Sequence, residues 1–140
     1  KAMDDGATPL YIASQNGHEA VVCLLLDRGA SIDKAMYSGA TPLSIASHGG
    51  HEAVVRLLLN RGANVDKARN DGRTPLLFAV RKGHVEVVRL LVRAGADTTL
   101  GGRFGPPIDQ ICEAPGADKA NEAEIRAILL SATEAEPSAS

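Results

Sequence analysis

The chain has 140 residues, enough for about one domain. Only two Tyr, two Phe and no Trp are present, so the core must be built from the plentiful Leu, Val, Ile and Ala. The formal net charge of −2 argues against a general attraction to nucleic acid or to acidic membranes, and we expect neither as a partner.

Two cysteines, Cys23 and Cys112, are too few for a disulfide framework. The longest purely apolar run, residues 20–26, is far shorter than the roughly 20 residues that a membrane-spanning helix needs. No signal peptide is visible at the start of the sequence, where Lys-Ala-Met matches residues 34–36, so we expect the chain to begin partway through a repeat. These features favour a reducing, intracellular compartment, cytoplasmic or nuclear.

Residues 8–29 predict two short helices joined by a tight turn. Thr8 is a candidate N-cap, because its hydroxyl can accept a hydrogen bond from a free amide of the first turn, and Pro9 suits the first helical position. Gly17 permits the left-handed turn that ends this helix, and a second helix from about residue 18 ends in the same way at Gly29. The polar segment that follows suits an extended, hairpin-like connection.

This pattern repeats along the chain with a period of 33 residues. Residues 1–33 and 34–66 are identical at 24 of 33 positions, and residues 34–66 and 67–99 at 16. Two helices this short are marginal in water by themselves, because they cannot bury their own apolar face. Stacked neighbours would share one continuous core, so the sequence predicts an all-α solenoid with repeats 1–33, 34–66 and 67–99.

After residue 99 the pattern decays. Residues 104–112, "FGPPIDQIC", resemble residues 71–80 with one residue deleted, and a longer loop follows. Asn121 and Glu124 have capping-box spacing, and the apolar residues 125, 128, 129 and 132 follow on one helical face. We therefore expect a degenerate capping repeat over 100–132 and a disordered tail over 133–140.

A 33-residue unit of the form G-x-T-P-L…A…G-H…V-V-x-L-L…G-A resembles the ankyrin repeat. The resemblance covers residues 1–99 and implies stacked helix-turn-helix units with projecting hairpin loops. It also implies a protein-binding scaffold without catalytic activity or cofactors, in which the hairpin tips and first helices line a concave binding face. The family usually has His after Thr-Pro-Leu, where this chain has Tyr11, Ser44 and Leu77, so we expect these side chains to be free for contacts.

Positions that differ among the three repeats are candidates for recognition, since they vary on a fixed scaffold. They are the hairpin tips, the residue after Thr-Pro-Leu and the end of each first helix. Drift at unconstrained surface positions is the alternative interpretation. The set expected to bind a partner is Asp4, Asp5, Tyr11, Gln15, Asn16, Tyr37, Ser38, Ser44, His48, Arg69, Asn70, Asp71, Arg73, Leu77, Arg81, Lys82, Arg103 and Phe104.

The distribution of charge along the chain indicates which part of this surface attracts an acidic partner. Residues 67–99 carry seven basic and three acidic residues, whereas residues 100–140 carry three and seven. Arg69, Arg73, Arg81 and Lys82 fall on hairpin or first-helix positions, so they can share one face. We expect a monomer whose partner is a protein or peptide with an acidic or phosphorylated segment.

The 33-residue period argues against catalytic and metal chemistry. His18, His51 and His84 recur with the period, but stacked helices lie about 10 Å apart, whereas the ligands of one zinc ion must lie within about 2.1 Å of it. We expect turn positions for these residues and no metal. Cys23 occupies a partly exposed position without a nearby His in register, which argues against a nucleophile.

The sequence therefore favours a non-catalytic scaffold for protein recognition. Two alternatives stay open. One is a structural spacer within a longer repeat array, and the other is a regulatory or targeting module of an enzyme whose catalytic part lies outside these residues.

Overall fold

The computed structural model describes residues 6, 8–98 and 119–135, and the fold of this part is entirely helical. The predicted all-α class and the paired short helices are confirmed. The helices are α1 (Pro9–Gln15), α2 (Glu19–Asp27), α3 (Pro42–Gly49), α4 (Glu52–Asn60), α5 (Pro75–Lys82), α6 (Val85–Arg93) and α7 (Lys119–Ala135).

The first helix of each repeat begins as the Thr-Pro-Leu motif predicts. The hydroxyl of Thr8 accepts a hydrogen bond from the Tyr11 amide at 3.2 Å, and Thr41 and Thr74 cap α3 and α5 in the same way. Proline occupies the first turn of all three helices, where its missing N–H costs no hydrogen bond. These local signals define the start of each first helix through contacts within its own repeat.

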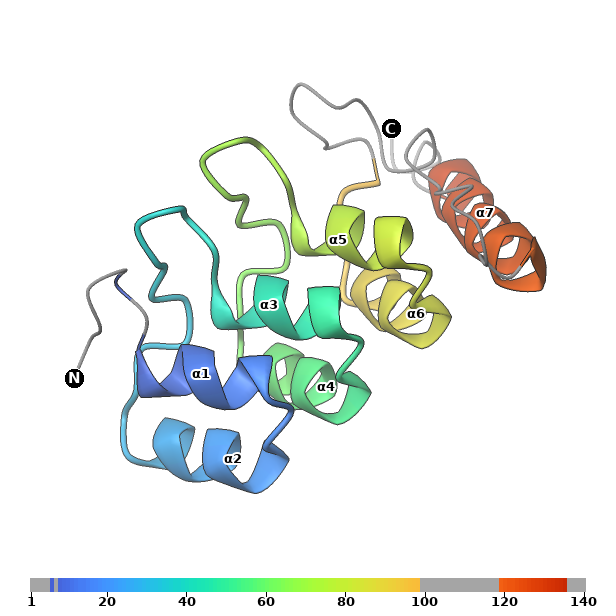
Figure 1. The fold of residues 1–140 in the computed structure, drawn as a ribbon. Coiled ribbons are helices and arrows are strands. Elements are labelled where there is room, and N and C mark those ends of the chain that lie inside the picture. Colours follow the sequence, from blue (N-terminus) through green and yellow to red (C-terminus); the bar gives the residue numbers. More distant parts are fainter. Residues whose placement is uncertain (1–5, 7, 99–118, 136–140) are drawn as a thin grey trace.

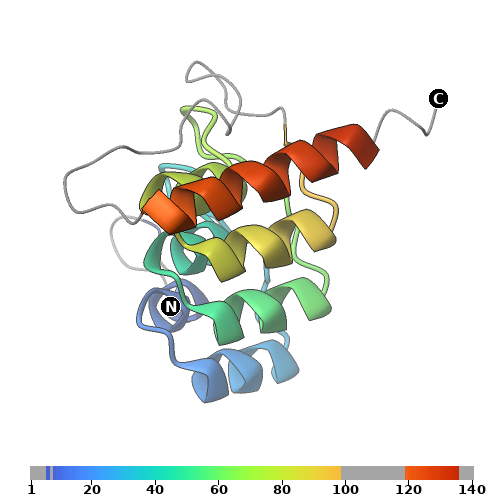
Figure 2. The same cartoon turned by 90° about the vertical axis from the view of Figure 1, so that its right-hand side faces the viewer.

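The repeats stack into two layers of helices (Figures 1 and 2). The first helices α1, α3 and α5 lie side by side in one layer, and the second helices α2, α4 and α6 form the other. One apolar cluster runs through the stack from Leu10 and Val22 to Ile125 and Leu129, with Leu58 near its middle. The predicted continuous core is thus present, and it reaches α7.

Acidic side chains at the start of each connecting loop join successive repeats. The carboxylate of Asp33 accepts a hydrogen bond from the Asn64 amide at 3.0 Å, and Asp66 accepts one from the Asp97 amide at 2.9 Å. Lys67 also donates to the carbonyl of Asp33 at 2.9 Å. These bonds recur with the period of the sequence, so they hold the loops in register along the stack.

Helix α7 closes the described end of the stack against α6 (Figure 2). Ile125 and Leu129 are buried, as their helical spacing predicts, and Arg89 of α6 approaches Glu124 at 3.4 Å. The capping box predicted at Asn121 is wrong, because the helix already begins at Lys119. The helix also continues through Ala135, past the boundary expected at residue 132, while the expected start of the capping repeat lies outside the described residues.

The other end of the stack leaves an apolar helix surface exposed. Val21 of α2 is 45% exposed, whereas Val54, at the same position one repeat later, is 1% exposed. The difference arises because α2 packs beside α4 in the second-helix layer, whereas the structure describes no second helix on the other side of α2. Within the described ranges, none of the helices combines the length and apolar composition needed to cross a bilayer.

This contrast predicts different costs for the same substitution. Val54→Ala should lower the free energy of unfolding by about 1–3 kcal/mol, because it removes buried methyl groups from a packed interface. Val21→Ala should change it by less than about 0.5 kcal/mol, since that side chain is largely in water. Both values follow from urea denaturation monitored by far-UV circular dichroism. Equal losses would mean that α2 is covered as fully as α4.

Candidate functional site

The first helices and the long loops form one side of the molecule, which we call the first-helix face: α1, α3, α5 and the loops 30–41 and 63–74. Figure 1 shows these loops projecting beyond the first helices, away from the second-helix layer. A hydrogen bond from the Asn70 amide to the Ser38 carbonyl, at 2.9 Å, joins the two loops. Most of the residues expected to bind a partner lie on this face.

The expected exposure of the residue after each Thr-Pro-Leu is wrong. Tyr11, Ser44 and Leu77 are 7%, 2% and 0% exposed. Each of these residues also donates its amide to the Thr that caps its helix. Ser44 also completes a capping box, since its hydroxyl accepts from the Thr41 amide at 2.8 Å. These positions therefore support the first-helix face instead of projecting from it.

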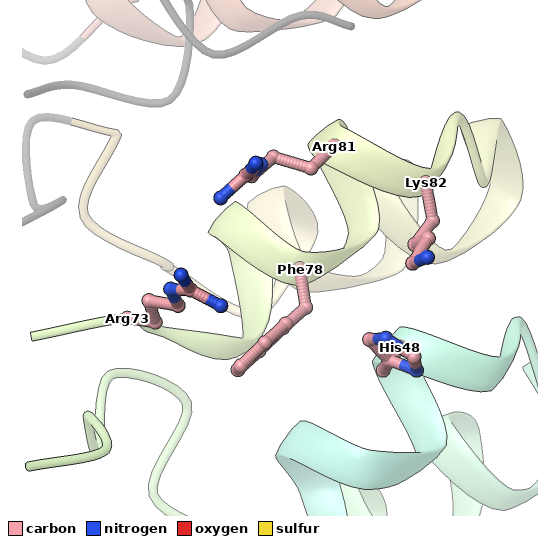
Figure 3. Close-up of a pocket in the computed structure, with 5 residues that line it drawn as sticks. All are labelled: His48, Arg73, Phe78, Arg81 and Lys82. Atoms are coloured by element: carbon pink, nitrogen blue, oxygen red, sulfur yellow. The ribbon is translucent and has the colours of Figure 1, made fainter. Parts of the chain in front are cut away.

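Between α3 and α5 the first-helix face contains a pocket of about 200 Å³. We call it the basic pocket; its lining is His48, Arg73, Phe78, Arg81 and Lys82 (Figure 3). A second hollow of about 260 Å³ shares three of these residues and extends to Tyr11 and Ser44, which form part of its lining although they are buried. Arg73, Arg81 and Lys82, which the sequence predicts to share one face, line this pocket together, and His48 lies beside them.

Phe78 lies at the centre of this arrangement. Its ring meets His48 edge to face, with the ring centroids 5.6 Å apart and the planes at 76°. The guanidinium of Arg69 lies over the same ring, 5.7 Å from its centroid, which is a cation–π geometry. Sequence reasoning missed Phe78, although the period places it at a variable position, equivalent to Ile12 and Ile45.

Asp71 fixes the arginines at the loop side of the pocket. Its carboxylate lies 3.3 Å from Nε of Arg73 and 3.9 Å from a terminal nitrogen of Arg69, and it accepts the Arg73 amide at 3.1 Å. Arg81 and Lys82 belong to the exposed last turn of α5. No carboxylate of the described residues forms an ion pair with either of them.

The position of His48 in this cluster lowers its pKa. Partial burial disfavours the charged imidazolium, and the positive charges of Lys82, His84 and Arg69 lower the pKa further. His48 is therefore held in its neutral form at pH values where an ordinary histidine would already be partly protonated. An anion that enters the basic pocket raises the pKa of His48 instead.

The loop tips present one exposed aromatic side chain. Tyr37 is 75% exposed, and its carbonyl accepts a hydrogen bond from the Asn70 side chain at 2.8 Å. Ser38 is half-buried, and its hydroxyl accepts from the Ala40 amide. The loop tips thus have a backbone held by hydrogen bonds and carry the aromatic ring of Tyr37 exposed to solvent.

Of the remaining expected residues, the structure describes Gln15 and Asn16. Gln15 and Asn16 are exposed at the end of α1, where the carbonyl of Gln15 accepts a hydrogen bond from His51. Asp4, Asp5, Arg103 and Phe104 fall outside the described residues.

Two of the three periodic histidines, His51 and His84, join neighbouring repeats. His18, His51 and His84 precede α2, α4 and α6 at the turn within each repeat, as expected. Nε2 of His51 donates to the Gln15 carbonyl at 2.9 Å, and Nε2 of His84 donates to the His48 carbonyl at 3.0 Å. Each bond joins the start of a second helix to the end of the first helix in the previous repeat.

The arrangement of the described His and Cys residues bears on metal and nucleophilic chemistry. In the part of the chain that the structure describes, no three His, Cys, Asp or Glu residues lie close enough to share a metal ion. Cys23 is half-buried, as expected, and its sulfur lies 3.6 Å from the guanidinium of Arg61 on the second-helix side. Cys112 lies outside the described residues.

Two family models match the sequence. Residues 31–101 match the model described as ankyrin repeats in three copies, and residues 5–36 match the model of a single ankyrin repeat. Comparison with the curated proteins found no match. Ankyrin repeats are generally protein–protein interaction modules, and only such repeats were found in this chain. With its 33-residue period, paired helices and projecting loops, the chain belongs to the ankyrin repeat family.

Proposed function

We propose that this chain is a non-catalytic recognition module that binds an acidic segment of a partner protein across its first-helix face. The basic pocket is the observation that carries the proposal. Three cationic side chains, Arg73, Arg81 and Lys82, line a concave site together with an aromatic ring, and no acidic residue of the described ranges is part of that lining. Such a site attracts carboxylates and offers Phe78 as an apolar wall.

The surroundings of the pocket favour recognition by a preformed surface. Thr74 caps the helix that carries Phe78, Arg81 and Lys82, and the His84 bond fixes the end of α3 at His48. A surface held in this way loses little conformational entropy when it binds. The exposed ring of Tyr37 lies at a loop tip of the same face, where it supplies contact area at low entropic cost.

Charge steers the partner towards one end of this face. The third repeat has a net charge of +4, compared with −3 for the first. An acidic segment is therefore attracted towards α5, and we expect its association rate to fall as salt is added.

Selection from a random-peptide display library on the immobilised chain tests this proposal. We expect the wild-type chain to enrich peptides with Asp or Glu beside an apolar residue. Arg81→Glu/Lys82→Glu should abolish that preference and weaken the best wild-type peptide by about tenfold or more, because charged hydrogen bonds are lost and replaced by repulsion.

Arg56→Glu/Arg93→Glu is the matched control, since it reverses two exposed charges on the second helices α4 and α6. Circular dichroism establishes that both variants keep the helical fold. If the wild-type chain enriches no peptide, or if the control loses as much affinity as the α5 variant, the proposal is wrong. The first of these outcomes would favour a structural spacer.

A further inference from the structure

We propose that the basic pocket takes a phosphorylated side chain of the partner, a phosphate monoester, in preference to a carboxylate. This inference rests on the proposed function and specifies the chemistry of its ligand. It draws on the direction from which the cations reach the pocket, on their number and on the position of His48.

Cationic groups reach the pocket from two sides. Figure 3 shows the guanidinium groups of Arg73 and Arg81 on one side of Phe78 and the ammonium group of Lys82 turned towards His48 on the other. A carboxylate presents two oxygens in one plane, which suits a single guanidinium edge. A phosphate monoester presents three acceptor oxygens in different directions, which suits donors on opposite walls.

The charge of the pocket points to a dianion. Among the described residues, Arg73, Arg81 and Lys82 contribute three positive charges to the lining, and Asp71, which also lies beside Arg69, offsets at most one of them. The balance is close to the charge of about −1.5 to −2 that a phosphate monoester carries at neutral pH. One carboxylate would leave Arg81 or Lys82 without compensation, because no described carboxylate pairs with either.

His48 can add a further donor when the ligand binds. Partial burial, and then the charges of Lys82, His84 and Arg69, lower the pKa of its imidazole, and Arg73 and Arg81 line the same pocket. A dianion among these groups offsets their positive charge and raises the pKa of His48. The pKa of the imidazole therefore rises as the ligand binds, and this rise marks occupation of this pocket rather than of another basic site.

The probes for the test are N-acetyl-phosphoserine amide and N-acetyl-glutamate amide, titrated into the chain and followed by NMR. We expect the phosphoserine probe to shift the resonances of His48 and Phe78 in a saturable manner and to bind about tenfold or more tightly than the glutamate probe. The pKa of His48, followed through its imidazole carbon-bound protons, should rise in the bound state.

Arg81→Ala/Lys82→Ala should weaken the phosphoserine probe by about tenfold or more, whereas Arg56→Ala/Arg93→Ala removes the same number of charges from the second helices and should leave binding unchanged. Equal affinity for the two probes, an unchanged pKa of His48, or an equal loss in the control variant would overturn the inference.

Failure here can be told apart from failure of the proposed function. If display selection yields acidic peptides that depend on Arg81 and Lys82, but the phosphoserine probe has no advantage over the glutamate probe, only the phosphate inference is wrong. If neither peptides nor probes depend on these two residues, both proposals fall.

Discussion

Leu58→Ala is expected to lower the free energy of unfolding by about 2–5 kcal/mol. Leu58 is 0% exposed on α4, in the repeat that has a neighbour on both sides, and it belongs to the apolar cluster that runs through the stack. The substitution removes buried methyl groups and leaves a cavity that rigid neighbouring helices fill only in part. A stack shares one core, so the loss should be felt by the whole domain and not by one repeat.

Urea denaturation followed by far-UV circular dichroism measures this loss. Leu24→Ala is the control, because Leu24 is 53% exposed on α2, a helix of the same length and nearly the same sequence. The control should change the free energy of unfolding by less than about 0.5 kcal/mol. A loss below about 1 kcal/mol for Leu58→Ala would contradict burial of this side chain between repeats.

The features that the sequence predicts well are those set by local chemistry. Thr8 and Pro9 define the start of α1 through contacts no farther along the chain than Tyr11. Gly17 ends the helix by adopting a left-handed conformation with φ of 73°. The same reasoning locates the second helices, which begin directly after the periodic histidines. Repetition then implies stacking, because each helix pair leaves its apolar face uncovered.

The exposure of side chains is harder to predict, because it depends on contacts between repeats. The variation among Tyr11, Ser44 and Leu77 suggests exposed side chains that are free for contacts. All three are buried, and each suits its own surroundings: the Ser44 hydroxyl completes a capping box, whereas Leu77 contributes only its amide to the cap of α5. Variation among repeats therefore reports differences in packing as well as differences in recognition.

The basic pocket is predictable only in part for the same reason. The charges of Arg73, Arg81 and Lys82 and their first-helix or loop positions are visible in the sequence. The pocket itself exists because α3 and α5 lie side by side and bring His48 against Phe78. No local pattern encodes that contact, which is why the sequence identified the charged rim but not the aromatic wall.

Gly50→Ala should cost about 2–3 kcal/mol, the sum of a backbone penalty and a lost hydrogen bond between repeats. Gly50 has a φ of 73°, which a residue with a Cβ adopts at a cost of about 1–2 kcal/mol. An added Cβ would also lie 2.8 Å from two atoms of the His84 ring. The ring must then move and give up its 3.0 Å bond to the His48 carbonyl.

Gly83→Ala separates the two contributions. Gly83 has nearly the same φ, 74°, but no described atom lies within 4 Å of its added Cβ, so only the backbone penalty of about 1–2 kcal/mol applies. In a His84→Ala background the cost of Gly50→Ala should fall to that of Gly83→Ala, because the ring that collides is absent. Urea denaturation of the four variants measures this coupling. An equal cost of Gly50→Ala in both backgrounds would mean that the His84 ring does not hold the end of α3, and with it His48, in place.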